Sequence, residues 1–337
     1  MKQLSYILYL FIITALVAGC QRRPLEDELG DLALVPIHID WSESALDMTT
    51  THNVSVWFFP HDGSSSFEYR YEGNLTDMEA RLPKGGYSII VFNETVDFNW
   101  TSLQFEGSDK YETFRVSARP DTFRGLNARG PEMDARKSPD ALAVWSTDKF
   151  EVSPEMVRAT AMGSRAGNTD SSQRIDVTLK PLTKIVKITA YVQNLTSALR
   201  CSGTLTGAVG EVMLSSSKAC LENVAHMFIM NDRIYKKENP NNGYIHANIL
   251  VFSASSDIKN TLTIDFQLTD GKTSSPDSFD VTEKVTQDLQ EVEVKVGADA
   301  GGPADEKDHP IVLPEVDVGG DMGVGVDDWQ DNLIQVT

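Results

Sequence analysis

Serine and lysine side chains occur in this sequence at two spacings that could support chemistry. Ser215 and Lys218 match the S-x-x-K pattern, in which the serine is the nucleophile of an acyl enzyme. The S-D-N and K-T-G elements that accompany this pattern are missing, and the match lies in a serine-rich loop. The stretch DGKTSS at 270–275 ends like a phosphate-binding loop, but Phe266 stands where its first glycine belongs. We therefore predict neither an acyl-enzyme site nor a phosphate site.

Residues that ligate metals also lack the spacing that a metal site requires. The sequence has no C-x-x-C, and no histidine has a partner four residues away on which a zinc site could be built. The acidic C-terminal segment lacks the spaced D-x-D-x-D-G loop that binds calcium. The scattered histidines are His38, His52, His61, His226, His246 and His309. The sequence predicts no catalytic residue, no metal and no cofactor, and hence a protein that is not an enzyme.

Cys20 is the residue for which the sequence most clearly predicts a chemical modification. An apolar run over 4–18 follows a basic start and is too short for a bilayer-spanning helix, which needs about 20 residues. Small residues then precede the cysteine, which is the layout of a secretory signal peptide. The segment Val-Ala-Gly-Cys resembles the bacterial lipobox, in which the cysteine is acylated and the chain is cut before it. The alternative is an ordinary cleaved signal with a chance cysteine.

If the lipobox is genuine, the N-terminal segment has two parts. Residues 1–19 are expected to be a removed signal peptide, and 20–31 a lipidated linker. Two or three acyl chains anchor a protein stably, whereas one alone is marginal. Residue 21 is Gln21, not the aspartate that in enteric bacteria tends to hold lipoproteins at the inner membrane. We expect a lipid-anchored protein of the outer membrane that faces the cell surface.

The other two cysteines, Cys201 and Cys220, flank a stretch rich in glycine and serine. An even pair in an exported protein is consistent with a disulfide. Two free thiols would look the same in sequence, so both possibilities stay open.

Composition limits the partners of the chain. Its 337 residues carry 49 acidic and 30 basic side chains, which gives a formal net charge of −19. Such a surface argues against binding nucleic acid or an anionic membrane through a basic patch. A length of this order suits two domains, and the hydrophobic content of 41% suffices for two cores.

Short runs rich in β-branched and aromatic residues, separated by turn residues, predict an all-β protein of sandwich or barrel type. Examples are LALVPIHIDW at 32–41, NVSVWFFP at 53–60 and GGYSIIVFN at 85–93. An arginine-rich segment over 106–142 is expected to be a long, partly irregular excursion.

Pro181 interrupts two strong strand patterns and cannot donate to a ladder, so we expect the boundary between two domains there. The expected domains are 32–180 and 181–297. An acidic C-terminal extension, 298–337, follows them. It carries two β-like islands, at 310–318 and 331–337, that could complete the second domain or pair with a neighbouring molecule.

Several tryptophans lie in or beside predicted strands: Trp41, Trp57, Trp100 and Trp145. Core packing is the simplest role for them. If their side chains were instead exposed on one face of the protein, they would form a sugar-binding platform. The protein would then be a carbohydrate-binding or nutrient-capture surface lipoprotein.

Five features together resemble the Bacteroidales fimbrillin-like lipoproteins, the subunits and anchors of type V pili. They are the lipobox, the strand soon after it, the LPKGGY turn at 82–87, the VTLKPLTKIVKI pair at 177–188 and the acidic extension. The resemblance implies two tandem transthyretin-like (Greek-key) β-sandwich domains. It also implies a structural or adhesive role at the outer membrane, with other pilus subunits bound by β-strand addition.

In polymerising members of that family, a protease cuts after Arg or Lys and releases the first strand. A C-terminal strand of the next subunit then fills the groove. The corresponding segments here are 32–41 and 310–337. Arg22 and Arg23 are the only basic residues between Cys20 and residue 60, and both precede the first strand. The sequence therefore favours an uncleaved anchor or accessory subunit, or a relative outside any pilus.

Overall fold

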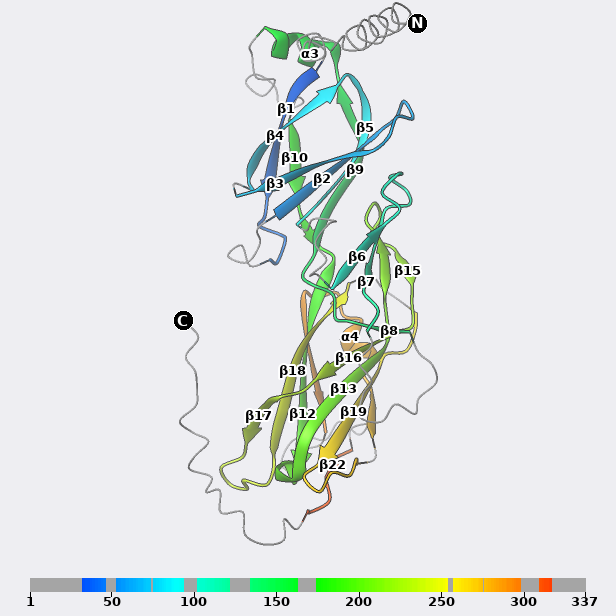
Figure 1. Ribbon diagram of the computed structural model, residues 1–337. Coiled ribbons are helices and arrows are strands. Elements are labelled where there is room, and N and C mark those ends of the chain that lie inside the picture. Colours follow the sequence, from blue (N-terminus) through cyan, green and yellow to red (C-terminus); the bar gives the residue numbers. More distant parts are fainter. Residues whose placement is uncertain are drawn as a thin grey trace, which may run out of the picture.

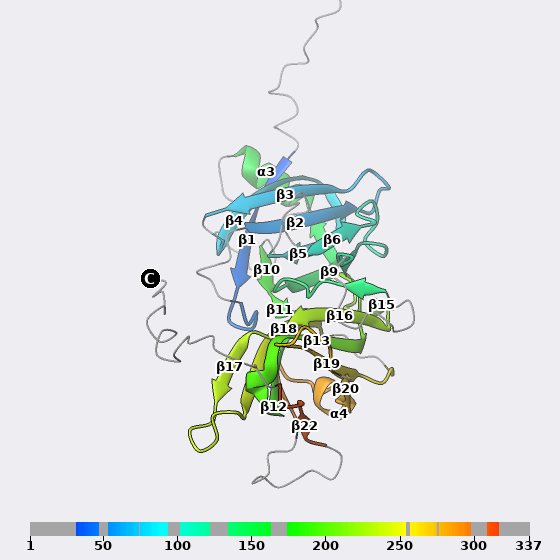
Figure 2. The same cartoon turned by 60° about the horizontal axis from the view of Figure 1, so that its bottom comes forward.

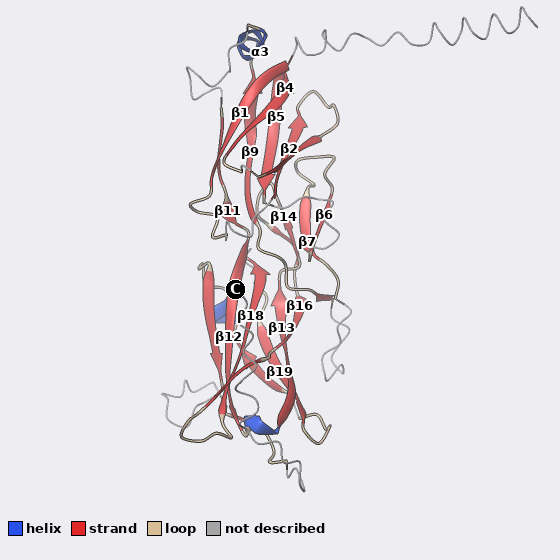
Figure 3. Ribbon diagram, turned by 60° about the vertical axis from the view of Figure 1, so that its left-hand side comes forward, coloured by secondary structure: helices blue, strands red, loops and turns tan. Residues whose placement is uncertain are grey.

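Strands make up nearly all of the regular structure in the computed structural model of this protein. They form two sandwiches stacked end to end in an elongated molecule (Figures 1 and 3). The all-β prediction is confirmed. The structure describes residues 32–46, 53–73, 75–93, 102–121, 134–162, 174–253, 257–274, 276–297 and 309–316. The expected signal peptide 1–19, the linker 20–31 with Cys20, and residues 317–337 lie outside this part of the chain.

The first sandwich consists of a three-stranded and a five-stranded sheet. Their orders are β10-β1-β4 and β11-β9-β5-β2-β3. The strands are β1 (Leu32–Asp40), β2 (Asn53–Pro60), β3 (Phe67–Glu72), β4 (Asp77–Pro83), β5 (Gly85–Phe92), β9 (Ala143–Val152), β10 (Ile175–Thr178) and β11 (Lys180–Pro181). Alternate residues of β1 and β4 are buried, as expected for strands with one face on a core.

A helix that the strand pattern did not predict, α3 (Pro154–Ala161), follows β9 and lies at the outer end of this sandwich (Figure 1). Ser153 caps its start by accepting a hydrogen bond from the main-chain N–H of Met156. Pro154 occupies the first turn, where its missing N–H costs nothing. Met156 is buried in the core and fixes the helix against the sandwich.

The second sandwich pairs the sheet β17-β18-β12-β21, with β22 also on β12, against the sheet β20-β19-β13-β16-β8. Figure 2 views the molecule with the free end of this sandwich turned forward. Its elements are β8 (Ala135–Arg136), β12 (Thr183–Gln193), η2 (Leu195–Ser197), β13 (Ala198–Ala208), β16 (Val224–Ile229), β17 (Asp232–Tyr235), β18 (Gly243–Phe252), β19 (Thr261–Leu268), β20 (Asp277–Asp280), α4 (Thr282–Val285), β21 (Glu291–Val296) and β22 (Ile311–Val312).

The two sandwiches repeat one plan. The order β3-β2-β5-β9 in the first matches β16-β13-β19-β20 in the second, and β4-β1-β10 matches β18-β12-β21. In each sandwich the first strand pairs in parallel with a strand from near its end, β1 with β10 and β12 with β21. This correspondence supports the division that we propose, with one domain over 32–180 and the other over 181–297.

A small sheet joins the two sandwiches. It has the order β15-β14-β7-β6, with β6 (Leu103–Glu106), β7 (Arg115–Ala118), β14 (Glu211–Met213) and β15 (Ala219–Leu221). The first half of the chain supplies β6 and β7, and the second half supplies β14 and β15. The arginine-rich segment expected to be partly irregular thus contributes β7 to the junction sheet and β8 to a sheet of the second sandwich.

A third hydrophobic core lies beneath the junction sheet and contains side chains from both halves of the chain, including Phe114 and Val212. The connection between the sandwiches is short, because β10 ends at Thr178 and β12 begins at Thr183. Leu182 lies in it, donates its N–H to the carbonyl of Leu142 at 2.7 Å and accepts from the N–H of Ser253 at 2.9 Å. The junction is therefore packed and hydrogen-bonded.

Candidate functional site

The strand that the family resemblance marks as removable, β1, lies in the middle of its sheet. It pairs antiparallel with β4 from Leu32 to His38, and parallel with β10 from Ile37 to Asp40. Its inward side chains, Ala33, Val35, Ile37 and Ile39, are at most 1% exposed. Loss of β1 would leave unpaired backbone on two neighbours and an open apolar groove.

Helix α3 covers the flank of β1 that β10 does not reach. The N–H of Leu34 donates to the Thr160 hydroxyl of α3 at 2.8 Å. That hydroxyl in turn donates to the carbonyl of Met156 at 3.1 Å. Two residues after Leu34, Pro36 has no N–H to offer on the same flank. Helix and proline together close an edge to which another strand could otherwise add.

Two tyrosines close the opposite edge of the sheet. The hydroxyl of Tyr69 on β3 donates to the carbonyl of Arg81 on β4 at 2.8 Å. The hydroxyl of Tyr71 donates in the same way to the carbonyl of Glu79 at 2.8 Å. Burial, with smaller effects from Tyr69 and Glu79, raises the pKa of Tyr71, so that its hydroxyl keeps the proton it donates. These contacts occupy outward-facing carbonyls of β4.

The first C-terminal island lies in its own chain's second sandwich. Along β12, Ala190 pairs with Val296 of β21, and Val192 pairs with Ile311 of β22, so that β22 continues the course of β21. Ile311 and Leu313 are at most 1% exposed in the core. Of the two alternatives for this island, completion of the second domain therefore holds for residues 311–313. The island at 331–337 lies outside the described residues.

Of the two possibilities left open for Cys201 and Cys220, the structure has two free thiols. Cys201 points into the core of the second sandwich from β13 and is 1% exposed, whereas Cys220 is exposed on β15 of the junction sheet. The hairpin of β14 and β15 leaves the sandwich and carries Cys220 to a different sheet. Burial raises the pKa of the Cys201 thiol and makes it unreactive.

The remaining chemical candidates do not converge. Ser215 lies in the turn between β14 and β15, where its carbonyl accepts from the Ser146 hydroxyl at 3.0 Å. His226 is a buried residue of β16 that lies opposite Arg136 of β8, and desolvation lowers its pKa. Among the residues that the structure describes, no group of three or more His, Cys, Asp or Glu side chains could hold a metal ion. No described helix is long and apolar enough to cross a membrane.

The described tryptophans pack against cores. Trp41 and Trp145 pack on the core of the first sandwich, and Trp41 donates its Nε1–H to the carbonyl of Leu75 at 3.0 Å. Trp57 packs on the junction core with its ring centroid 5.1 Å from that of Phe114. Trp100 lies outside the described residues.

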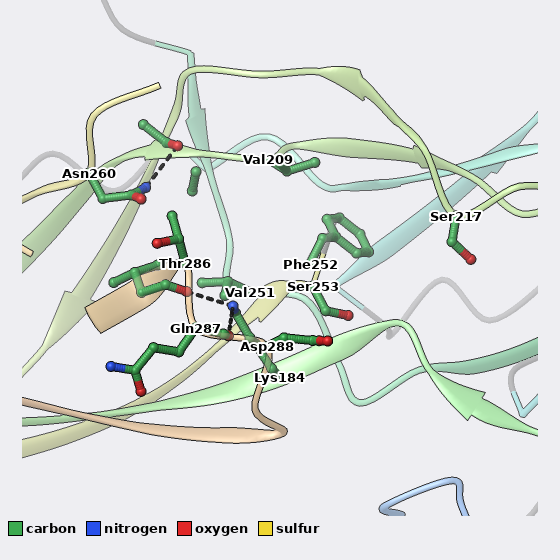
Figure 4. A pocket seen from close by; sticks show the side chains of 13 residues that line it. Lys184, Val209, Ser217, Val251, Phe252, Ser253, Asn260, Thr286, Gln287 and Asp288 are labelled. Atoms are coloured by element: carbon green, nitrogen blue, oxygen red, sulfur yellow. Dashed lines mark hydrogen bonds between the residues drawn. The ribbon is translucent and has the colours of Figure 1, made fainter. Parts of the chain in front are cut away.

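One cavity of about 440 Å³ lies at the junction end of the second sandwich (Figure 4). Buried Lys184 and Asn260 line it, together with Phe252 and with Thr286 and Asp288 of the turn after α4. Sequence reasoning missed this site, since no local motif marks residues that come from six separate segments.

A family model described as "Domain of unknown function (DUF5119)" matches residues 19–229. The chain belongs to this DUF5119 family. A protein of Bacteroides ovatus named "Putative fimbrium anchoring subunit Fim4B" is 30% identical over 154 residues. That match spans 44% of this chain and 43% of the relative, less than half the length of either.

A solved structure described as "a putative adhesin" from Bacteroides ovatus shares the fold of this DUF5119 protein. It covers 88% of this chain and 98% of its own, with a TM-score of 0.59 and 19% identity. At this identity the likeness establishes the fold alone. The predicted resemblance to fimbrial proteins of Bacteroidales is confirmed by the relative named as a fimbrium anchoring subunit.

Proposed function

We propose that this protein is a fimbrial anchoring or accessory subunit, held by lipid on Cys20 at the outer membrane. It keeps its N-terminal strand and binds other subunits by main-chain pairing, without catalysis. The observation that carries the proposal is the position of β1. One side of β1 pairs with β4, and the end of the other side pairs with β10. Helix α3 and Pro36 close the rest of that second side. The relative named as a fimbrium anchoring subunit supports it.

The distribution of basic residues supports retention of β1. The sequence from 24 to 69 contains no Lys and no Arg, so a protease specific for either has no site between the linker and β3. Cleavage after Arg22 or Arg23 would release the lipid but leave β1 in its sheet. A subunit that keeps β1 has no empty groove to accept a donor strand, and therefore suits the end of a fibre.

An Arg-specific protease tests the proposal on the purified chain with Cys20→Ser. We expect removal of residues up to Arg23 at most, with the product still monomeric by size-exclusion chromatography. Glu43→Arg places a cleavage site in the exposed turn after β1 and gives the matched variant, from which β1 can be detached. Loss of β1 from the parent chain, followed by a ladder of oligomers, would identify a stalk subunit instead.

Membrane attachment has a separate test. Lipidation of Cys20 predicts that the full chain incorporates labelled fatty acid and sediments with outer membranes, and that Cys20→Ser abolishes both. A Cys20→Ser chain that still takes up the label would refute this part of the proposal.

A further inference from the structure

The cavity at the junction end of the second sandwich has the size of a small-molecule site. Its volume of about 440 Å³ lies within the range of about 300–1,000 Å³ typical of ligand pockets. It is lined by residues from β12, the end of β13, the turn between β14 and β15, the end of β18, the segment before β19, and the end of α4 with the turn after it. It therefore lies between the two sheets of the second sandwich beside the junction hairpin, and combines buried with exposed groups.

A positively charged donor lies within this cavity. Lys184 on β12 is 6% exposed, and its Nζ donates to the main-chain oxygens of Val285 at 2.5 Å and Gln287 at 3.0 Å (Figure 4). An ammonium group has three N–H donors. Two are used here, and the described residues provide no partner for the third. Desolvation lowers the pKa of Lys184, and Asp288 opposes this effect.

A fixed acceptor lies on the same cavity. Asn260 is 4% exposed, and its Nδ2 donates to the carbonyls of Gly207 at 2.9 Å and Thr206 at 3.4 Å. These two bonds hold the orientation of the carboxamide and leave Oδ1 as the group able to accept. The cavity thus has one donor, the Lys184 ammonium, and one acceptor, the Asn260 Oδ1. Hydrogen bonds to the main chain fix the position of each of these buried side chains.

The rest of the lining is polar at the exposed positions and apolar at the buried ones. Thr286, Gln287 and Asp288 are exposed and supply a hydroxyl, a carboxamide and a carboxylate. Phe252 and Val209 are at most 3% exposed and supply apolar surface. A hydroxylated ring fits this combination, because adjacent hydroxyls both accept and donate while the C–H groups pack on apolar side chains.

Charge decides between ligand classes. Two carbonyl oxygens already face the Lys184 ammonium, and Asp288 and the net charge of −19 disfavour an anion. A cation would be repelled by the buried ammonium. A purely apolar ligand would leave the Lys184 and Asn260 groups without partners, which costs about 1–3 kcal/mol for each buried group.

We propose that this cavity binds one neutral, hydroxylated ligand of monosaccharide size, with Lys184 and Asn260 as donor and acceptor and Asp288 at the opening. The inference is independent of the proposed role in a fimbrium. The competing interpretation is that Lys184 only caps the carbonyls at the end of α4.

The test is titration of the Cys20→Ser chain with neutral hexoses and N-acetylhexosamines at millimolar concentration, followed by NMR of the labelled protein. We expect saturable shifts with at least one of these sugars and none with glucuronate. Asp288→Ala should weaken binding about tenfold, which corresponds to about 1.4 kcal/mol. Thr286→Trp should abolish binding by blocking the opening.

Glu283→Trp provides the matched control, because Glu283 is an exposed residue of α4 that does not line the cavity. Its binding should equal that of the parent chain. Because Lys184→Met removes a buried group and can prevent folding, the two exposed substitutions decide the outcome. Absence of binding to every neutral sugar would overturn the proposal, and so would binding that Thr286→Trp leaves unchanged.

Discussion

Shortening one inward side chain of β1 should cost the protein a large part of its stability. Ile37 is 1% exposed and lies where β1 is paired on both sides, with Met78 of β4 and Ile175 of β10. Ile37→Ala removes buried methyl and methylene groups from a position that two neighbouring strands hold in place. Relaxation can therefore fill little of the space that the substitution creates.

The expected cost follows from the burial of Ile37. Substitutions of this kind lower the free energy of unfolding by about 2–5 kcal/mol. The adjacent residue gives the control, since the His38 side chain is 38% exposed and its Nδ1 is hydrogen-bonded to Oδ1 of the exposed Asp77 at 2.8 Å. Loss of such an exposed pair changes the free energy of unfolding by about 1 kcal/mol or less.

Urea denaturation of the Cys20→Ser chain and both variants, followed by tryptophan fluorescence, measures the difference. Trp41, Trp57 and Trp145 all lie in the first half of the chain and report on the sandwich that contains β1. If Ile37→Ala costs no more than His38→Ala, β1 is not an integral strand of the core. The argument for a retained N-terminal strand would then fail.

Three further predictions concern the junction, the thiols and the response to pH. Phe114→Ala removes a ring from the junction core, should cost about 3–5 kcal/mol and should split one calorimetric transition into two; an unchanged single transition would contradict the shared core. In the Cys20→Ser chain, a thiol reagent should modify Cys220 in the folded protein and Cys201 only after unfolding, whereas two inert thiols in the denatured, unreduced chain would reveal a disulfide. Desolvation lowers the pKa of His226 below the unfolded value of about 6.5, so the unfolded state takes up the proton first as the pH falls. Stability should therefore be lost below about pH 6.5, by up to about 1.4 kcal/mol per pH unit, and His226→Gln should lack this loss; equal pH profiles would refute the assignment.

Local patterns predicted most strands of this protein. The alternation in 32–41 identified β1, and Pro181, where we propose the boundary between the domains, lies in β11 just before β12. Helix α3 has a readable signal in Ser153 and Pro154, since a capping serine before proline is typical of a helix start.

Pairing between distant segments could not be predicted. Val116 of β7 lies opposite Val212 of β14, and neither strand carries a local signal that names its partner. The arginines around β7 made that segment resemble a loop. The hairpin of β14 and β15 also separates Cys201 from Cys220, because it leaves β13 and pairs with β7 from the first half of the chain.

The parallel pairing of β1 with β10 has a mechanical consequence. A pull applied at the start of β1 and at the end of β10 drives these neighbours lengthwise past each other, so that their hydrogen bonds resist together instead of breaking one after another. The same geometry recurs for β12 and β21, from Ile185 to Ala190. Unfolding under force is governed by the unfolding barrier. Both sandwiches are therefore arranged to withstand tension along the long axis of the molecule.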